Sequence, residues 1–419
     1  MKPTQKYGIL LSLYLAQSIP MSFFSTVLPV IMRMEEYSLS SIGLIQLIKI
    51  PWIVKFLWGP IVDHNARDNM HYRKWIIGSE VFYAVVIVAI GFFNLQSNFT
   101  TIIVLMIIAF VMSSIQDIGS DALAVRILKK TERGLGNSMQ SSGNFLGTLF
   151  GSGVLLFLYT VIGWQYLMFV LSGIVLIALI PVSRYREPRK QQEFHLKRNR
   201  IAFSNILGFF RQKRIGRRVT LLVIFYAGII GILAMLKPYL VDLGYTVKEI
   251  AFMTGIFGTG FGAGSAFLGG YILRRLGNMN GLRLFALYGC LAAAFMTFVA
   301  FGNTHIVLIY IGIALIWSAY GMSSVAIFTI SMNTVRKGKE GTDYTLQIVL
   351  THLSSLLVVV ISGRIGDWIG YSGLFLTEAL VGLIVTLSIG RLYFDPELAR
   401  QPDYVISEQI KKEESTICR

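Results

Sequence analysis

Long apolar stretches alternate with short polar ones along almost the whole chain of 419 residues. Each stretch holds about 20 residues, the length of helix that crosses roughly 30 Å of hydrocarbon. The first stretch is too long for the core of a signal peptide, so we interpret it as a retained span. We predict an all-α integral membrane protein with twelve transmembrane helices, at residues 7–32, 39–62, 74–94, 101–123, 136–160, 162–183, 219–241, 248–273, 283–302, 304–330, 344–362 and 372–394.

Composition agrees with this pattern, since 54% of the residues are hydrophobic, 14% are charged and the mean hydropathy is +0.63. Soluble domains carry far more charge. Only Cys290 and Cys418 are present, which gives no disulfide framework. Nothing in the spacing of His, Cys, Asp and Glu indicates a metal or cofactor site, and no catalytic cluster at an interfacial loop indicates an enzyme.

The net charge of +16 comes from Lys and Arg that gather in alternate connections. This distribution is typical of cytoplasmic loops and predicts that both chain termini are cytoplasmic. The longest connection, 184–218, contains twelve Lys and Arg residues. We interpret it as an orienting linker beside anionic lipid rather than a nucleic-acid site.

The basic linker divides the chain into two similar halves. At an offset of 207 residues, Gly134 matches Gly341, Gln140 matches Gln347, Thr148 matches Ser355, and Gly163-Trp164 matches Gly370-Tyr371. We therefore predict a six-helix bundle at 1–183, a cytoplasmic linker at 184–218, a second six-helix bundle at 219–394 and a polar, disordered cytoplasmic tail at 395–419. Parallel repeats of this kind place a substrate site near the membrane midplane, between the halves.

Two carboxylates interrupt the fourth apolar stretch. Asp117 and Asp121 are four residues apart and so share one helix face. A charge inside the membrane is costly, so these residues are candidates for proton coupling. Lys55 is at nearly the depth of Asp117 when each span is counted at about 1.5 Å per residue. We predict that the two form an ion pair; the alternative is that Lys55 extends to the cytoplasmic surface.

Polar residues near the predicted midplane are candidates for binding substrate. Lys49 is the central cation of the second span, and an anionic substrate would suit it; alternatively it bonds carbonyl groups freed by Pro51. Gln17 has either a substrate or an interhelical role. His352 is either an ordinary hydrogen-bonding side chain or a proton carrier. Our predicted substrate-binding set is Lys49, Gln17, His352, Gln46 and Gln347.

Glycines recur every fourth position in two spans. Gly143, Gly147 and Gly151 lie in the fifth, and Gly258 and Gly262 lie in the eighth. Small residues at this spacing allow close approach of helix backbones. We predict that the two rows pack against each other across the interface between the halves.

The segment after the second span contains Gly59, Asp63, Arg73 and Lys74. It resembles the signature between the second and third spans of major facilitator proteins, in which the aspartate anchors a latch to a helix across the bundle. The corresponding segment of the second half has Arg274 in place of the aspartate. The resemblance therefore implies an asymmetric latch, whereas turn formation alone is the alternative.

Further stretches are similar to the muropeptide permease (AmpG) branch of the major facilitator superfamily, which also holds acetyl-CoA transporters and siderophore importers. They are Lys55-Phe56-Leu57-Trp58-Gly59-Pro60, Gln116-Asp117-Ile118-Gly119-Ser120-Asp121-Ala122, Glu132-Arg133-Gly134 and Gly163-Trp164-Gln165. The resemblance implies proton-driven import of anhydro-muropeptides through the bacterial inner membrane, by a monomer without cofactors. A siderophore importer is the alternative, and a membrane-embedded transferase or a non-transporting sensor is a more distant one.

Overall fold

The computed structural model describes residues 1–34, 36, 48–64, 66, 68–95, 97–186 and 203–393. All regular secondary structure within these ranges is helical. The first half contains α1 (Pro3–Ser22), η1 (Phe23–Val27), α2 (Leu28–Met34), α4 (Ile50–Ile53), η3 (Lys55–Leu57), α5 (Gly59–Val62), α6 (Asn69–Gly91), α7 (Phe99–Ile127), α8 (Lys130–Leu149), η4 (Phe150–Val154), α9 (Leu155–Ala178) and α10 (Ile180–Ser183).

The second half contains α11 (Ser204–Phe210), α12 (Ile215–Ile224), α13 (Ala227–Asp242), α14 (Val247–Ile250), η6 (Ala251–Gly258), α15 (Thr259–Ala300), α16 (Ile306–Asn333) and α17 (Glu340–Leu392). Gln46, residues 187–202 of the basic linker and the tail at 395–419 lie outside the described residues.

Within the described residues, eight helical segments are long and apolar enough to cross a membrane. Three of them hold two spans each, because the chain bends sharply at Gly163, Gly277 and Gly370. The second predicted span, whose first part lies outside the described residues, completes the twelve helices of the predicted fold.

The repeat seen in the sequence is also present in the backbone. Gly163 has φ 72° and ψ −178°, and Gly370, 207 positions later, has φ 72° and ψ 177°. Glycine adopts a positive φ without a steric penalty from a side chain. The two halves therefore make the same turn between their fifth and sixth spans.

The second span departs from the continuous helix predicted at 39–62. Its described part consists of the short segments α4, η3 and α5. Pro51 and Pro60 lie at the starts of α4 and α5. Proline removes a backbone donor and clashes with the preceding turn, which accounts for the breaks. Lys55 consequently lies in a 3₁₀ turn rather than on a regular helix face.

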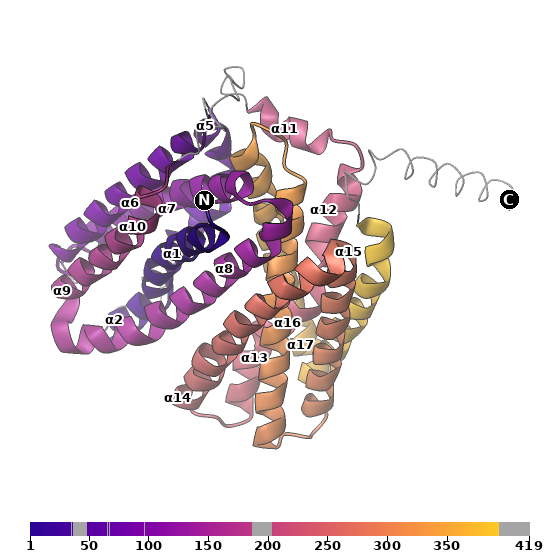
Figure 1. Cartoon of the computed structure of the whole chain (residues 1–419). Helices are drawn as coiled ribbons and strands as arrows, with labels where there is room; N and C mark the ends of the chain where they lie inside the picture. The colour runs from indigo at the N-terminus through magenta and orange to yellow at the C-terminus, as the bar shows by residue number, and fades with distance from the viewer. Residues whose placement is uncertain are drawn as a thin grey trace, which may run out of the picture.

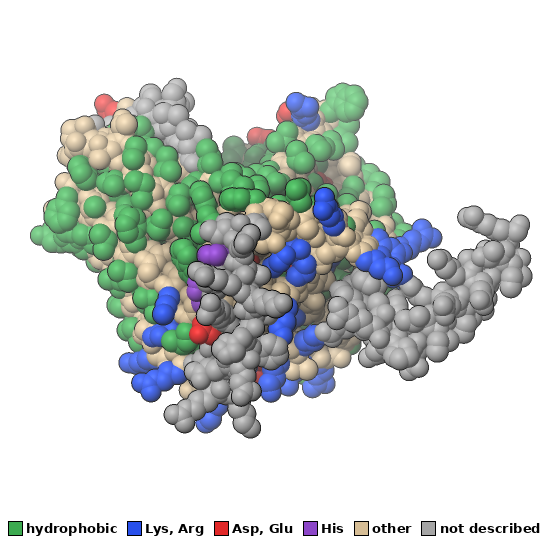
Figure 2. All heavy atoms as spheres, turned by 90° about the horizontal axis from the view of Figure 1, so that it is seen from above, with side chains coloured by type: hydrophobic (Ala, Val, Ile, Leu, Met, Phe, Trp, Pro, Cys, Tyr) green, Lys and Arg blue, Asp and Glu red, His purple; other side chains and the backbone are tan. Residues whose placement is uncertain are grey.

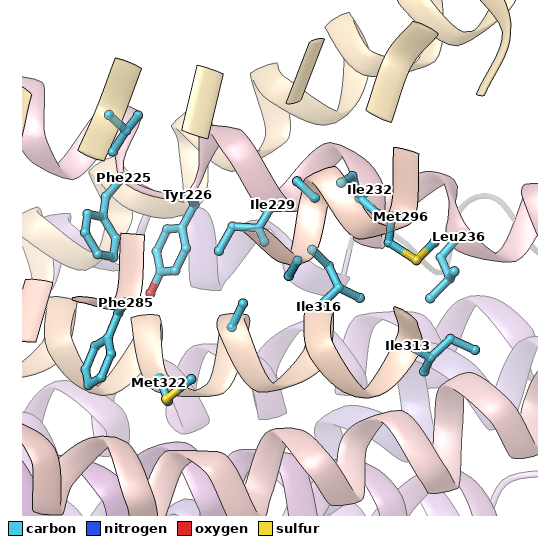
Figure 3. Packing of buried hydrophobic residues seen from close by; sticks show 14 of the residues in the cluster. Phe225, Tyr226, Ile229, Ile232, Leu236, Phe285, Met296, Ile313, Ile316 and Met322 are labelled. Carbon is cyan, nitrogen blue, oxygen red and sulfur yellow. The ribbon is translucent and has the colours of Figure 1, made fainter. Parts of the chain in front are cut away.

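The helices of the two halves form two bundles that lie side by side (Figure 1). The bundles meet near the end that carries α5 and α11, and they diverge toward the opposite end. Contacts between them involve α8 with α15 and α16, and α17 with α5 and α7. Each half has its own apolar core, and Figure 3 shows that of the second half, where Ile229, Ile232 and Ile316 pack together with Met296.

The predicted packing of the two glycine rows is wrong for four of the five residues. Gly143, Gly147 and Gly151 face α1 of their own half, where an added Cβ would lie 3.0, 2.5 and 2.4 Å from atoms of Tyr14, Ser18 and Ile19. Gly258 faces Trp317 within the second half. Only Gly262 faces the other half, toward the ring of Phe145. The fifth and eighth spans do face each other across the interface between the halves, as predicted, but the glycine row of the fifth span lies on the face toward α1.

The contact between α8 and α15 depends instead on serines. Ser138 donates a hydrogen bond to the carbonyl of Ala266 (2.7 Å), and Ser142 donates to that of Ala263 (2.9 Å). A Cβ at Gly134 would lie 2.9 Å from the carbonyl oxygen of Gly270, so the backbones nearly touch. Serine is small enough for this approach and can bond across helices, which the search for glycines missed.

Lys and Arg gather over the middle and lower part of the face seen from above in Figure 2, while hydrophobic side chains cover its upper left. This face carries α5 and α11. Its basic character is what the cytoplasmic assignment of the linker leads us to expect.

A cysteine introduced at Gln192, with Cys290 and Cys418 replaced, should resist a membrane-impermeant thiol reagent in intact cells and react after permeabilisation. The reason is that residue 192 belongs to the basic linker, which we assign to the cytoplasm. A cysteine at Ser97, in the opposite set of connections, is the matched control and should react from outside. Labelling of position 192 in intact cells would reverse the topology.

Candidate functional site

A buried ion pair joins the second and fourth spans. The Lys55 Nζ donates to Asp117 Oδ2 at 2.5 Å, and both side chains are almost inaccessible. The Gln17 amide on α1 donates to the other oxygen, Asp117 Oδ1, at 2.7 Å. The structure thus contains the pair that the depth count predicts. It also gives Gln17 an interhelical bond, which is one of the two roles left open for it.

Asp121 lies one turn further along α7 and is equally buried, at 1% exposure. Its Oδ1 accepts a hydrogen bond from the Tyr14 hydroxyl at 2.5 Å and a longer one from the Gln140 amide at 3.4 Å. Both partners are neutral. Within the described residues, no Lys, Arg or His forms an ion pair with this carboxyl.

The hydrogen bonds of Asp121 continue into the second half. Gln140 on α8 accepts a hydrogen bond from the Tyr344 hydroxyl on α17, at 3.2 Å. Sequence reasoning did not assign a role to Tyr14, Gln140 or Tyr344. A signal was available for two of them: Tyr14 precedes Gln17 by one turn on the same helix face, and Gln140 is one of the polar positions repeated between the halves.

Two further predicted substrate residues, Lys49 and His352, come from different halves of the chain. Lys49 is half-buried beside the start of α4, and no partner of its ammonium group is found in the part of the chain described. His352 is exposed on α17, within electrostatic range of Lys55 and Asp117.

Gln347 does not fit the predicted substrate-binding role. It is fully buried, and its Oε1 accepts hydrogen bonds from the Arg218 guanidinium at 2.9 and 3.0 Å. Its Nε2 donates to the carbonyls of Ser331 and Asp343. Both atoms of the amide are therefore already hydrogen-bonded inside the second bundle. One of them is needed there, because a buried guanidinium must be hydrogen-bonded.

Asp63 connects the halves at the end where they meet. Its carboxylate accepts hydrogen bonds from the backbone of Gly341 (2.9 Å), from the backbone and hydroxyl of Thr342 (2.7 Å each) and from the Tyr72 hydroxyl (2.8 Å). The first two residues form the N-terminal turn of α17, whose free N–H groups and dipole favour an anion. Burial nevertheless raises the pKa of Asp63 to about 6, because desolvation outweighs these hydrogen bonds.

The cation at this latch is Arg126 rather than the predicted pair Arg73 and Lys74. The Arg126 Nε lies 3.3 Å from the Oε1 of Glu340, the first residue of α17. The Arg73 guanidinium instead donates to the carbonyls of Val182 and Ser183, at the end of α10 in its own half. Arg73 lies in the first turns of α6, beside that helix end, which attracts a cation.

A second contact of the same kind lies beside the first. The Arg133 guanidinium donates to the Met332 carbonyl (3.0 Å) and to the Asn333 side chain (2.6 Å), at the C-terminal end of α16. The first half thus presents a carboxylate to one helix start and a guanidinium to one helix end of the second half. Both contacts have the sign that the helix dipole favours.

Replacing Gly59 with valine should prevent closure of this end of the molecule. A Cβ at residue 59 would lie 2.9 Å from the Thr342 Cα, so the halves would have to separate. We expect cysteines placed behind the latch to become reactive from the end of the molecule that carries α5 and α11. Gly78→Val is the matched control, since a Cβ there meets nothing within 4 Å. Equal reactivity of both variants would show that the contact does not hold the halves together.

Relatives of known name match most of the chain. It is 24% identical to the anhydromuropeptide permease of Escherichia coli (strain K12) over 388 residues, which cover 91% of this chain and 79% of the permease. It is 21% identical to the putative transporter AmpG 2 of Rickettsia typhi, with 83% of this chain and 86% of that protein covered.

Solved structures show the same fold. A structure of the E. coli fucose:proton symporter FucP matches with a TM-score of 0.71 at 14% identity, covering 94% of this chain and 100% of that one. A bacterial homologue of the iron transporter ferroportin in the outward-facing state matches with a TM-score of 0.67 at 17% identity, covering 94% and 99%. The family model of the Major Facilitator Superfamily matches residues 10–359, and the chain therefore belongs to this superfamily.

Proposed function

We propose that the protein imports an anionic, anhydro-muropeptide-like solute through the bacterial inner membrane, by alternating access coupled to protons. The chain is a membrane transporter and not an enzyme, as its family and relatives indicate. The relative from E. coli that is named an anhydromuropeptide permease supports the substrate class. The end carrying the latch is cytoplasmic in this proposal, so the halves are closed toward the cytoplasm.

The main support for proton coupling is the imbalance of charges buried in the first half. Asp117 and Lys55 neutralise each other, whereas Asp121 has only neutral partners. An isolated carboxylate in a low-dielectric interior costs far more than the neutral acid, so such a group binds a proton. We assign Asp121 as the proton carrier and the Lys55–Asp117 pair as its electrostatic neighbour.

Helix α17 supports a link between this proton and the movement of the halves. Its first turn bonds Asp63 at the latch, and Tyr344, in the same part of the helix, bonds Gln140 and through it Asp121. Loss of the proton would place a full charge on Asp121 next to Tyr14 and Gln140. The hydrogen bonds at Gln140 would then rearrange, which changes the contact with the second half.

Lys49 supports an anionic substrate. It is half-buried, with no partner among the described residues, in a bundle whose other central cation is neutralised by Asp117. A carboxylate on the solute would supply the missing charge, and the low local dielectric strengthens the contact. His352, exposed on α17, faces the same central region from the second half.

Uptake into proteoliposomes tests the function. A labelled anhydro-muropeptide should accumulate when an inward proton gradient is imposed, and a protonophore should abolish its accumulation. If a labelled ferri-siderophore accumulated instead, the proposed substrate class would be wrong, while the proposed proton coupling would still hold. Uptake that persists undiminished with the protonophore, in the absence of sodium, would reject proton coupling.

Replacing Lys49 with glutamine should weaken binding of the anionic solute by at least tenfold, because one charge-assisted hydrogen bond contributes about 1.5–3 kcal/mol and each tenfold change corresponds to about 1.4 kcal/mol. Lys237→Gln is the matched control, because Lys237 is exposed on α13. Equilibrium binding to the purified variants measures the effect. Unchanged affinity in a well-folded K49Q protein would favour the alternative, in which Lys49 bonds carbonyls near Pro51.

A further inference from the structure

A second buried acid lies within the first bundle, apart from Asp117 and Asp121. Glu80 is in the middle of α6, and only 1% of it is exposed. Neither of its carboxyl oxygens has a hydrogen-bond partner in the part of the chain that the structure describes. Within the described residues, no Lys, Arg or His forms an ion pair with it. A carboxylate in these surroundings would be strongly disfavoured, so the side chain is the neutral acid and holds a proton.

Other polar atoms without partners lie on the helices around Glu80. Helices α6 and α7 are packed together, and a Cβ at Gly119 would lie 3.1 Å from the Ile76 side chain. One turn from this contact, toward the middle of the membrane, α6 carries Glu80 and α7 carries Gln116. Both side-chain amide atoms of Gln116 are buried without a partner, as is the hydroxyl of Ser120.

Tyr83, one turn further along α6, has a buried hydroxyl that interacts electrostatically with Glu80 and lies near Ser113 of α7. Native proteins rarely leave buried polar atoms unsatisfied, and ordered water commonly bridges them. The α6–α7 contact therefore holds a polar region in which protons can be exchanged between side chains.

This polar region leads to the proposed proton carrier. Gln116 and Ser120 precede Asp117 and Asp121 directly, and successive helix residues are about 100° apart, so the two sets occupy adjacent faces of α7. The remaining titratable groups near Glu80 are few. Helix α9 contributes only tyrosines, and the described α10 contributes none.

We propose that Glu80 is a second proton-binding site of the transporter, connected to Asp121 through the polar side chains of α7. The proposal rests on the proton coupling inferred above. Glu80 keeps its proton in the present conformation. When Asp121 has released its own proton, the O–H bond of Glu80 breaks and the proton passes through bridging water to the Asp121 carboxylate. When the conformation changes, the Glu80 carboxylate takes up a hydronium proton from the side of the membrane that supplies protons, which restores the neutral acid.

The test compares Glu80→Gln with Glu378→Gln. Glutamine has the size of the neutral acid but carries no exchangeable acidic proton. Glu378 is a matched control, because it is similarly buried in the second half but bonds Ser362 at 2.7 Å. We expect Glu80→Gln to fold and bind substrate, to carry fewer protons per solute and to shift the pH profile of uptake. Glu378→Gln should leave both unchanged.

Infrared difference spectroscopy gives a readout that does not depend on transport. The unmodified protein should show the carbonyl band of a protonated carboxylic acid that changes with substrate binding, and Glu80→Gln should lose it. An identical spectrum and an identical pH profile in Glu80→Gln would overturn the proposal and make Glu80 a structural acid. If instead uptake by the unmodified protein persisted undiminished with a protonophore, the proposed coupling would fail, whereas a band lost in Glu80→Gln would still assign Glu80 as a proton-binding site. If Glu80→Gln does not insert, Glu80→Asp takes its place, with a shifted band and profile expected.

Discussion

Replacing Asp121 with asparagine is expected to abolish accumulation of solute against its gradient while leaving exchange of solute across the membrane. Asparagine has the shape of the neutral acid and can accept the hydrogen bond of Tyr14, but it cannot release a proton. Net proton-driven uptake should fall by at least tenfold, equivalent to about 1.4 kcal/mol, because the step that resets the empty carrier needs deprotonation. Initial rates of uptake and of counterflow in proteoliposomes measure the two activities separately.

The control for this variant is Asp367→Asn, which changes an exposed carboxylate on α17. It should behave like the unmodified protein in both assays. A D121N protein that still accumulates solute would move the coupling to another group, such as His352. One that loses counterflow as well would make Asp121 a residue needed for movement of the halves rather than for coupling.

Much of the fold could be predicted from the sequence because membrane spans have a strong pattern. Length and hydropathy fix the number of spans, and the glycine repeated 207 residues apart marks the same turn in both halves. The second span was less predictable. Its composition fits a helix, but Pro51 and Pro60 divide it into short segments. A depth count that assumes one regular helix cannot predict the directions of these segments.

The charged residues of the site could be predicted from the sequence, whereas the neutral polar residues could not. A buried charge in the membrane is tolerated mainly when it is paired, so the similar depths of Lys55 and Asp117 were enough to predict that they form an ion pair. Neutral groups such as Tyr14 and Tyr344 face no such constraint, so their bonds to the site depend on how the helices are rotated.

The latch shows the same limit. Asp63 was identified by its position in a known signature, whereas the cation of the latch, Arg126, lies on a different helix and pairs with Glu340. Several arginines near the cytoplasmic ends are equivalent in sequence. Which of them reaches Glu340 depends on the packing of α7 against α17.

A double-mutant cycle on Lys55 and Asp117 should give the largest stability effects in the protein. Replacing Lys55 with glutamine leaves a buried carboxylate without its cation, and replacing Asp117 with asparagine leaves a buried ammonium group. Each single change should cost about 3–5 kcal/mol of stability, the range measured for breaking one side of a buried ion pair. The double variant, with no charge left, should be more stable than either single one.

Unfolding of the purified proteins in detergent measures the coupling between the two substitutions. The pair formed by Lys6 and Glu132 is the matched control, because it has a similar distance of 2.6 Å but more exposed side chains. Water screens such a pair, so its coupling should be no more than about 1 kcal/mol. Strict additivity at Lys55 and Asp117 would show that the two charges are stabilised independently. In that case Gln17, which bonds the other oxygen of Asp117, would be the group that holds the carboxylate, and Gln17→Leu should then be more harmful than Lys55→Gln.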